Sequence, residues 1–377
     1  MCSSLIRSVT RNRKGRGSLK NYLWLCLLAC LPSSVLAQGV DLTPPGPEER
    51  DLTASRRVFP EIGPGLRAVR EGADGRVYLL VSPQPGVLVF DARGKEVLQV
   101  GAGLSSNASV KARPAAIGFG EDLDVDDDGK IYVADRRANT ILIFSPEGTL
   151  LRTIPVNNPV SVAALPEGEV AVATLRDEHL ILVFDKNGRD IREFGDSEPL
   201  SDRDDLNRYL STGLLAADAQ GHLFYAFPYM PEPVIRQYDR FGFVGQEIQY
   251  TPIDALQVAQ AARKEIQRQE RRHEPPYLKR NITGIAVDRS SGEAWVGLHH
   301  ALLHFDKEGI RRATYTLYTP DGSPLEATSI LVDKQHLLVG NEAQGIYEFP
   351  RPDKAADKAA AASATEHASS AEKKVSP

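Results

Sequence analysis

The hydrophobic positions of the chain recur in short runs that end at glycine-bearing turns. The clearest run has three or four apolar residues, an aromatic residue, usually an aspartate, and then a glycine. Runs of β-branched and aromatic residues between glycine turns are typical of hairpin strands. This pattern therefore predicts an all-β protein. The run occurs at residues 87–94, 141–148, 181–188, 234–242 and 302–309, with a sixth copy at 345–349 that lacks the glycine.

The spacing of these copies predicts the architecture. Their aromatic residues are 54, 40, 54, 67 and 44 residues apart. A period of about 40 residues with insertions indicates stacked units that cannot bury their faces alone. Each unit has the pattern of four short strands joined by tight turns. We therefore predict a six-bladed β-propeller of four-stranded antiparallel blades.

The propeller is expected to cover residues 54–350. The sixth unit has three strands between residues 329 and 349, and a proline-containing segment follows it. Residues near 55–62 precede the first unit and are patterned like a fourth strand. We expect this segment to complete the last blade and close the ring.

The amino-terminal segment has the pattern of an export signal. Residues 1–37 contain six basic and no acidic residues, an apolar stretch at 22–31, and small residues before Gln38. This order is typical of a secretory signal peptide, and the apolar stretch is shorter than the roughly 20 residues that span a membrane. We expect a periplasmic or secreted protein. An uncleaved anchor, or a lipid on Cys30, is the alternative.

The composition limits the possible partners. The chain is 42% hydrophobic and 25% charged, as expected for a globular protein. Without residues 1–37 it holds 39 Lys and Arg against 50 Asp and Glu, and an acidic surface repels nucleic acids. All three cysteines lie within residues 1–37. We expect a monomer, with a linker at 38–53, a disordered tail at 351–377, and no membrane contact other than a lipid anchor.

One unit resembles a known repeat family. Residues 124–144 contain an Asp-Gly turn, the strand Tyr-Val-Ala-Asp, an asparagine at Asn139, and a closing Ile-x-x-Phe at Ile141 to Phe144. This segment resembles an NHL repeat, and a weaker resemblance extends over residues 66–350. The resemblance implies a propeller of a family whose members are mostly binding scaffolds. Distant relatives include metal-dependent hydrolases of the gluconolactonase and regucalcin type, and peptide-amidating lyases.

The topology of such a blade predicts which face carries function. The connections from second to third strand, and from fourth strand to the next blade, emerge on one face, which we call the loop face. The opposite face, with the other connections, is the turn face. Most extra length falls on the loop face, where function usually lies. It includes an insertion at 250–282 with a basic helix predicted over 255–272, between blades 4 and 5.

The loop face supplies the candidate binding residues. They lie in the predicted connections between second and third strands. The stretch from Phe227 to Pro231 is the most suggestive, because aromatic residues bounded by prolines can anchor a ligand. The candidates are Arg136, Arg137, Asn139, Arg176, His179, Phe227, Tyr229, Met230, His299, His300 and Asn341.

The sequence gives little support for metal binding. Asp124, Asp126 and Asp128 have the spacing of a calcium loop, but a strand–turn–strand segment would spread them along an extended chain. His300 and His304 would lie about 13 Å apart on a strand, too far to share an ion. We therefore predict no cofactor; calcium or zinc belongs to the alternative function described next.

Motifs for catalysis are also missing. The chain contains no Gly-x-Ser-x-Gly and no His-Glu-x-x-His sequence. The sequence therefore favours an exported, non-catalytic binding propeller that recognises a protein, peptide or glycan. The alternative is a metal-dependent, lactonase-like hydrolase on the same fold.

Overall fold

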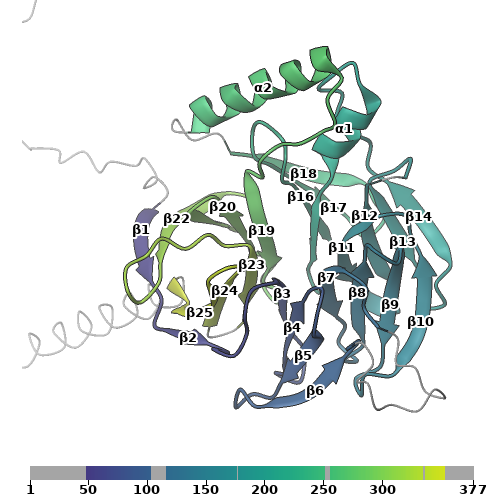
Figure 1. The fold of residues 1–377 in the computed structure, drawn as a ribbon, viewed down its shortest axis with the longest axis vertical. Helices are drawn as coiled ribbons and strands as arrows, with labels where there is room; N and C mark the ends of the chain where they lie inside the picture. The colour runs from purple at the N-terminus through teal and green to yellow at the C-terminus, as the bar shows by residue number, and fades with distance from the viewer. Residues whose placement is uncertain (1–47, 103–115, 176, 251–254, 334–335, 353–377) are drawn as a thin grey trace, which may run out of the picture. The chain divides into compact units, whose positions relative to one another are not determined.

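The computed structural model describes residues 48–102, 116–175, 177–250, 255–333 and 336–352. These residues form six sheets that fan out around a common centre (Figure 1). The first strands of the sheets contact one another in order around the ring, and β23 contacts β3. The predicted six-bladed β-propeller is thus confirmed.

Each of the first four blades is formed from four consecutive antiparallel strands. The first two blades contain β3 (Leu66–Glu71), β4 (Val77–Val81), β5 (Gly86–Phe90) and β6 (Glu96–Val100), then β7 (Gly120–Val125), β8 (Ile131–Asp135), β9 (Thr140–Phe144) and β10 (Leu150–Pro155). The next two contain β11 (Pro159–Ala164), β12 (Val170–Thr174), β13 (Ile181–Phe184) and β14 (Asp190–Phe194), then β15 (Leu214–Ala217), β16 (Leu223–Phe227), β17 (Val234–Tyr238) and β18 (Val244–Gln249).

The last two blades each take one strand from the amino-terminal side of the chain. Arg56 lies opposite Glu348 in the antiparallel pair that completes the sixth blade, and their side chains form an ion pair at 2.6 Å. This strand lies where the sequence predicts a closing strand near 55–62. The fifth blade contains β19 (Ile282–Val287), β20 (Ala294–Leu298), β21 (Ala301–Phe305), β22 (Arg311–Tyr318) and β1 (Glu48–Thr53); the sixth contains β23 (Ser329–Val332), β24 (His336–Asn341), β25 (Gly345–Pro350) and β2 (Arg56–Val58).

The hydrophobic core lies between the blades. Six clusters of buried residues each join one blade to the next around the ring. The largest fully buried side chains include Trp295, Tyr78 and Tyr225. A single blade would expose these surfaces to water, so each blade depends on its neighbours for burial.

The recurrent sequence run is explained by its turn. The aromatic residue is buried, as at Phe90, which is 1% exposed. The Oδ1 atom of Asp91 accepts a hydrogen bond from the Lys95 N–H at 2.9 Å, and Gly94 has a φ of 75°. The same aspartate contact recurs at Asp185 and Asp239. Aspartate side chains cap turns of this kind, and glycine adopts positive φ without strain.

Two elements depart from the sequence analysis. β1 lies within the predicted linker 38–53 and pairs in parallel with β22. Its side chains are mostly exposed, so pairing rests on the backbone groups of an edge strand and leaves no hydrophobic pattern. Helix α2 (Ala255–Arg272) lies between blades 4 and 5 as predicted, but α1 (Asp204–Ser211), between blades 3 and 4, was not predicted.

Some predictions fall on the termini. Residues 1–37, most of the linker and residues 353–377 lie outside the described residues. No helix within the described ranges is long and apolar enough to cross a membrane.

Candidate functional site

The predicted binding residues lie on the loop face but are distributed around the ring. Five connections between second and third strands, in blades 2 to 6, carry them. Arg176 lies outside the described residues. The prediction thus identifies a face of the propeller, and the residues do not form one cluster.

Several of these side chains stabilise the loops that carry them. The Oδ1 atom of Asn139 accepts a hydrogen bond from the Asn158 N–H at 2.9 Å. Asn341 is 9% exposed, and its side chain hydrogen bonds to the backbone of Glu326 and Ala343. Arg136 forms an ion pair with Glu121 at 2.8 Å. These contacts give the residues structural roles.

Two predicted binding residues belong to the core instead. Phe227 is fully buried and Met230 is 6% exposed, and both pack in the cluster between blades 3 and 4. The sequence predicts a ligand anchor in this stretch, whereas both side chains point into the interior. Only Tyr229 of that stretch is partly exposed.

The histidine candidates occupy separate loops. His179 lies between β12 and β13, with its Nδ1 atom 3.7 Å from a carboxylate oxygen of Asp196. His299 has a φ of 52° in the turn between β20 and β21, and burial lowers its pKa. His300 follows in the same turn and is exposed.

Tyr229 is part of a compact aromatic group at the loop face, which we call the Tyr–Arg platform: Tyr209, Tyr229 and Arg280. The rings of Tyr209 and Tyr229 have centroids 4.6 Å apart. The Nε atom of Arg280 donates a hydrogen bond to the Tyr229 hydroxyl at 3.2 Å. Burial, together with the adjacent Tyr229, raises the pKa of Tyr209 to about 12. Tyr209 is therefore neutral at neutral pH.

The platform is held in place by the helices and by one asparagine. Tyr209 and Tyr229 pack against a small core of Leu206, Leu210, Ile266 and Leu278, which joins α1 to α2. Asn281 follows Arg280 directly, and its side-chain amide donates to the Met230 carbonyl at 2.6 Å. Its backbone N–H donates to the Pro228 carbonyl at 2.7 Å. The loop that carries Tyr229 and the segment that carries Arg280 are therefore joined.

Helix α2 is a docked element rather than a free basic surface. Ala259 and Ile266 are buried against the fold, whereas Leu256 is 46% exposed. Arg263 forms an ion pair with Glu232 at 2.8 Å, and Arg268 with Glu265 at 2.6 Å. These pairs neutralise part of the positive charge seen in the sequence.

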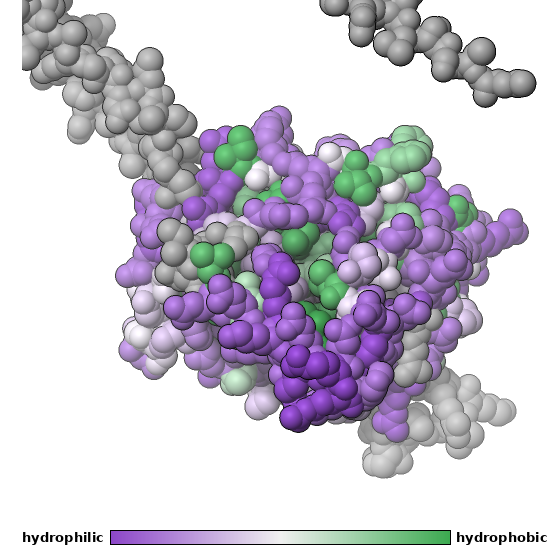
Figure 2. Space-filling view, turned by 90° about the horizontal axis from the view of Figure 1, so that it is seen from above, coloured by the Kyte–Doolittle hydropathy of each residue, from purple (hydrophilic) through white to green (hydrophobic). Residues whose placement is uncertain are grey.

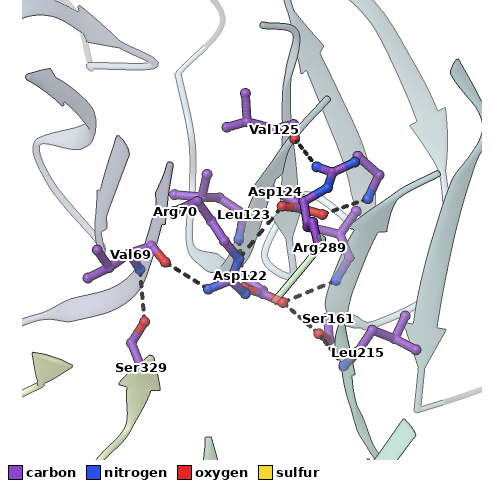
Figure 3. Close-up of polar contacts among 12 residues, drawn as sticks. Val69, Arg70, Asp122, Leu123, Asp124, Val125, Ser161, Leu215, Arg289 and Ser329 are labelled. Atoms are coloured by element: carbon purple, nitrogen blue, oxygen red, sulfur yellow. Dashed lines mark hydrogen bonds and ion pairs between the residues drawn. The ribbon is translucent and has the colours of Figure 1, made fainter. Parts of the chain in front are cut away.

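Polar side chains of the first strands connect the blades around the central channel (Figure 3). The Nη2 atom of Arg70 donates to Asp122 Oδ1 at 3.0 Å, and the Ser161 hydroxyl donates to Asp122 Oδ2 at 2.5 Å. Ser161 Oγ also accepts the backbone N–H of Leu215 at 2.9 Å. Ser329 Oγ accepts the N–H of Val69 at 2.8 Å. Five of the six innermost strands are thus joined by hydrogen bonds.

Asp122 is the most buried charged group of this network. Burial raises its pKa, and the adjacent Arg70 guanidinium and Ser161 hydroxyl oppose that shift. A buried carboxylate is tolerated only when it is paired and hydrogen bonded, and Asp122 meets both conditions.

The network divides the channel into two cavities. A cavity of about 100 Å³ opens toward the loop face and is lined by Arg67, Glu121 and Arg280. A cavity of about 500 Å³ opens toward the turn face. Arg70, Leu215 and Ile285 line both cavities and therefore lie where the two adjoin. The larger space lies on the face opposite to the predicted binding residues.

The three aspartates with calcium-loop spacing contact different partners. Asp124 Oδ2 accepts the backbone N–H of Ala164 at 2.8 Å, and Asp126 accepts the Tyr132 hydroxyl at 2.9 Å. Asp128 is exposed and pairs with Lys130 at 2.8 Å. In the described part of the chain, no group of three or more His, Cys, Asp or Glu could hold a metal ion.

The sequence analysis missed the channel network and most of the platform. Asp122 and Asp124 flank a buried leucine in a first strand, and this alternation of charged and apolar residues is the signal that could have identified the channel wall. Arg70 has the same position in β3. Nothing in the sequence places Tyr209 beside Tyr229, because that contact depends on the packing of α1 against α2.

Comparisons with known proteins yield similar structures only. No protein-family model and no curated protein matches the sequence, so the NHL resemblance stays a prediction. A streptogramin B lyase is 15% identical with a TM-score of 0.46, over 78% of this chain and 85% of that one. Virginiamycin B lyase from Staphylococcus aureus is 12% identical with a TM-score of 0.44, over 78% and 87%. A calcium-binding regucalcin from Agrobacterium tumefaciens is 12% identical with a TM-score of 0.48, over 80% and 95%. Identities this low carry no information about a shared activity.

Proposed function

We propose that the protein is an exported, non-catalytic binding propeller of the NHL type. It holds a protein, peptide or glycan partner on the loop face, at the Tyr–Arg platform. The observation that carries this proposal is the incomplete hydrogen bonding of the Arg280 guanidinium. Its Nε atom is hydrogen bonded to Tyr229, whereas its two terminal nitrogens donate to no other described residue.

The chemistry of the platform suits a partner that combines a ring with a carboxylate. Tyrosine and arginine are enriched among the residues that dominate binding energy. A planar guanidinium binds a carboxylate through two parallel hydrogen bonds. The tyrosine rings offer an adjacent face for a proline, an aromatic ring or a sugar.

The surface around α2 is consistent with recognition through polar contacts. Figure 2 views the side of the molecule that carries α2, and it is mostly hydrophilic with small, separate hydrophobic groups. Large continuous apolar patches mark obligate interfaces, and this view shows none. The platform therefore suits a small epitope or an oligosaccharide better than a large hydrophobic interface.

Binding to peptide and glycan arrays tests the proposal. We would probe both arrays with the purified chain from residue 38 onward, as wild type, Arg280→Ala and Lys307→Ala. Lys307 is 70% exposed and lies in the connection between β21 and β22, on the turn face, so it serves as the matched control. We expect Arg280→Ala to weaken the strongest signals at least about tenfold and Lys307→Ala to leave them unchanged. The absence of any ligand, or equal losses in both variants, would contradict the proposal.

Export is tested separately. The signal pattern of residues 1–37 predicts cleavage after Ala37. Mass spectrometry of the protein from a bacterial host should therefore find an amino terminus at Gln38 in the periplasmic or secreted fraction. An intact amino terminus in the cytoplasmic fraction would contradict export.

A further inference from the structure

The larger cavity of the channel is separate from the Tyr–Arg platform. It opens between the turns that follow the first strands, including Gly72 in blade 1 and Ser290 in blade 5. Its volume of about 500 Å³ falls within the range of small-molecule sites, roughly 300–1,000 Å³. Arg70 lies where it adjoins the cavity on the loop face.

The wall of the cavity is partly apolar. Leu215, Ile285 and Val287 of neighbouring blades line it, and each is at most 8% exposed. Leu331 of the sixth blade is also 8% exposed and lines the cavity. Rigid apolar walls beside a few polar groups are the usual composition of a ligand pocket.

Negative charge predominates in the lining. Five carboxylates and two guanidiniums face or border the space. Near the rim, Asp288 is neutralised by Arg351 at 2.6 Å, and Asp127 lies 3.4 Å from Arg289. At the inner end, a single guanidinium, that of Arg70, is shared by the carboxylates of Asp122 and Asp124.

Asp124 has unused hydrogen-bonding capacity at the inner end. Its Oδ2 atom accepts a backbone N–H from β11, but its Oδ1 atom lies 3.7 Å from Arg70 Nε, beyond hydrogen-bond distance. No other described residue donates a hydrogen bond to Oδ1. Figure 3 shows Asp124 between Arg70 and Arg289, beside the Asp122 pair. An added cationic donor would complete the coordination of this oxygen.

We infer that the turn-face cavity binds a small organic cation, with its ammonium group on Asp124 and its apolar body against Leu215, Ile285 and Leu331. The ammonium donates to Asp124 Oδ1, and the excess of carboxylates attracts the positive ligand into the cavity. The apolar body displaces water from the buried aliphatic side chains. This site does not depend on the function proposed for the loop face.

Three probes of similar size and different charge test the inference. Phenethylammonium, phenylacetate and phenethyl alcohol are titrated into the purified chain, and binding is followed by calorimetry and ligand-observed NMR. The variants are Asp124→Asn and the exposed control Asp128→Asn, which removes the same charge four residues away outside the cavity lining. Ala73→Trp, at an exposed turn position that lines the mouth, blocks entry without altering the core.

We expect phenethylammonium to bind the wild type and Asp128→Asn equally. Asp124→Asn and Ala73→Trp should each weaken it at least about tenfold, and phenylacetate should not compete. If Asp124→Asn fails to fold, Ala73→Trp decides the question alone. The inference is overturned if phenethylammonium does not bind, if phenylacetate binds as well, or if a folded Asp124→Asn or Ala73→Trp binds like the wild type. Arg280→Ala should leave this binding unchanged, which separates it from the loop-face proposal.

Discussion

Arg70 of β3 and Asp122 of β7 form an ion pair with 3.0 Å between Nη2 and Oδ1, and this pair joins two blades at the point where the two cavities of the channel adjoin. Ser161 extends the contact to the third blade. The innermost strands of neighbouring blades belong to separate sheets and are not paired through their backbones. Hydrogen bonds between their side chains therefore fix how adjacent blades are oriented, in addition to the hydrophobic packing that closes the ring.

We expect the substitution of Asp122 to lower the free energy of unfolding strongly. Asp122→Ala removes the hydrogen-bonded carboxylate from Arg70, whose side chain is 19% exposed, so that only the longer Asp124 contact at 3.7 Å remains, and it leaves the Ser161 hydroxyl without its acceptor. Breaking one side of a buried pair costs about 3–5 kcal/mol, and we expect the free energy of unfolding to fall by that amount. Urea denaturation measures it.

Asp128→Ala is the control for that substitution. Asp128 is 79% exposed, and surface changes of this kind stay within about 0.5 kcal/mol. A loss below about 1 kcal/mol for Asp122→Ala would show that the network contributes little to stability.

The lowered pKa of Asp288 makes the free energy of unfolding depend on pH. Burial alone would raise its pKa, but hydrogen bonds from Ser290 and Arg351 outweigh burial, and the pKa lies below its usual value. The unfolded chain therefore binds this proton at higher pH than the folded one does. The stabilisation by Asp288 is present above about pH 4 and is lost as the pH falls through the lowered pKa.

A comparison of the wild type with Asp288→Asn isolates the pH-dependent stabilisation that the Asp288 carboxylate provides. The difference between their free energies of unfolding should be largest at neutral pH and should shrink toward about pH 3. Urea denaturation across this range provides the measurement. A difference that stays constant, or grows in acid, would rule out the assigned shift.

We expect Gln269 to support the Tyr–Arg platform by holding the segment that leads to Arg280. It is 2% exposed, its side-chain nitrogen donates to the Tyr277 carbonyl at 2.6 Å, and its oxygen accepts the Tyr277 N–H at 3.0 Å. Gln269→Leu removes both hydrogen bonds to the Tyr277 backbone, each worth about 0.5–1.5 kcal/mol. We expect faster amide hydrogen exchange over residues 273–281 and weaker binding at the platform.

Arg271→Ala is the matched control on the same helix. Arg271 is exposed and makes no ion pair with a described residue. Its loss should leave exchange over 273–281 unchanged. If Gln269→Leu behaves in the same way, the segment before β19 is held by the small core between the helices alone.

The repeat could be predicted from the sequence because its rules are local. Each copy ends in a buried aromatic such as Phe90 and a turn built by Asp91 and Gly94, and this pattern survives insertions of any length between copies. The helix over 255–272 was also predictable, since it contains no glycine or proline and is followed by two prolines.

The candidate site could not be predicted in the same way. Phe227 and Tyr229 are two residues apart, yet Phe227 is fully buried and Tyr229 faces the helices, because a loop need not continue the alternation of a strand. The pairing of β1 with β22 uses backbone groups, so it leaves no pattern of side chains. The Arg70–Asp122 pair joins residues of two different blades, and only the closed ring brings them together.

Hydrogen exchange with a bound ligand tests the central claim most directly. The chain from residue 38 onward is measured alone and with the tightest peptide or glycan from the arrays, and protection is mapped along the sequence. The account predicts new protection at residues 206–211, 228–231 and 278–281, which carry and support the Tyr–Arg platform. Protection confined to the turn face, at residues 72–75 and 288–292, with no change at the platform, would contradict it.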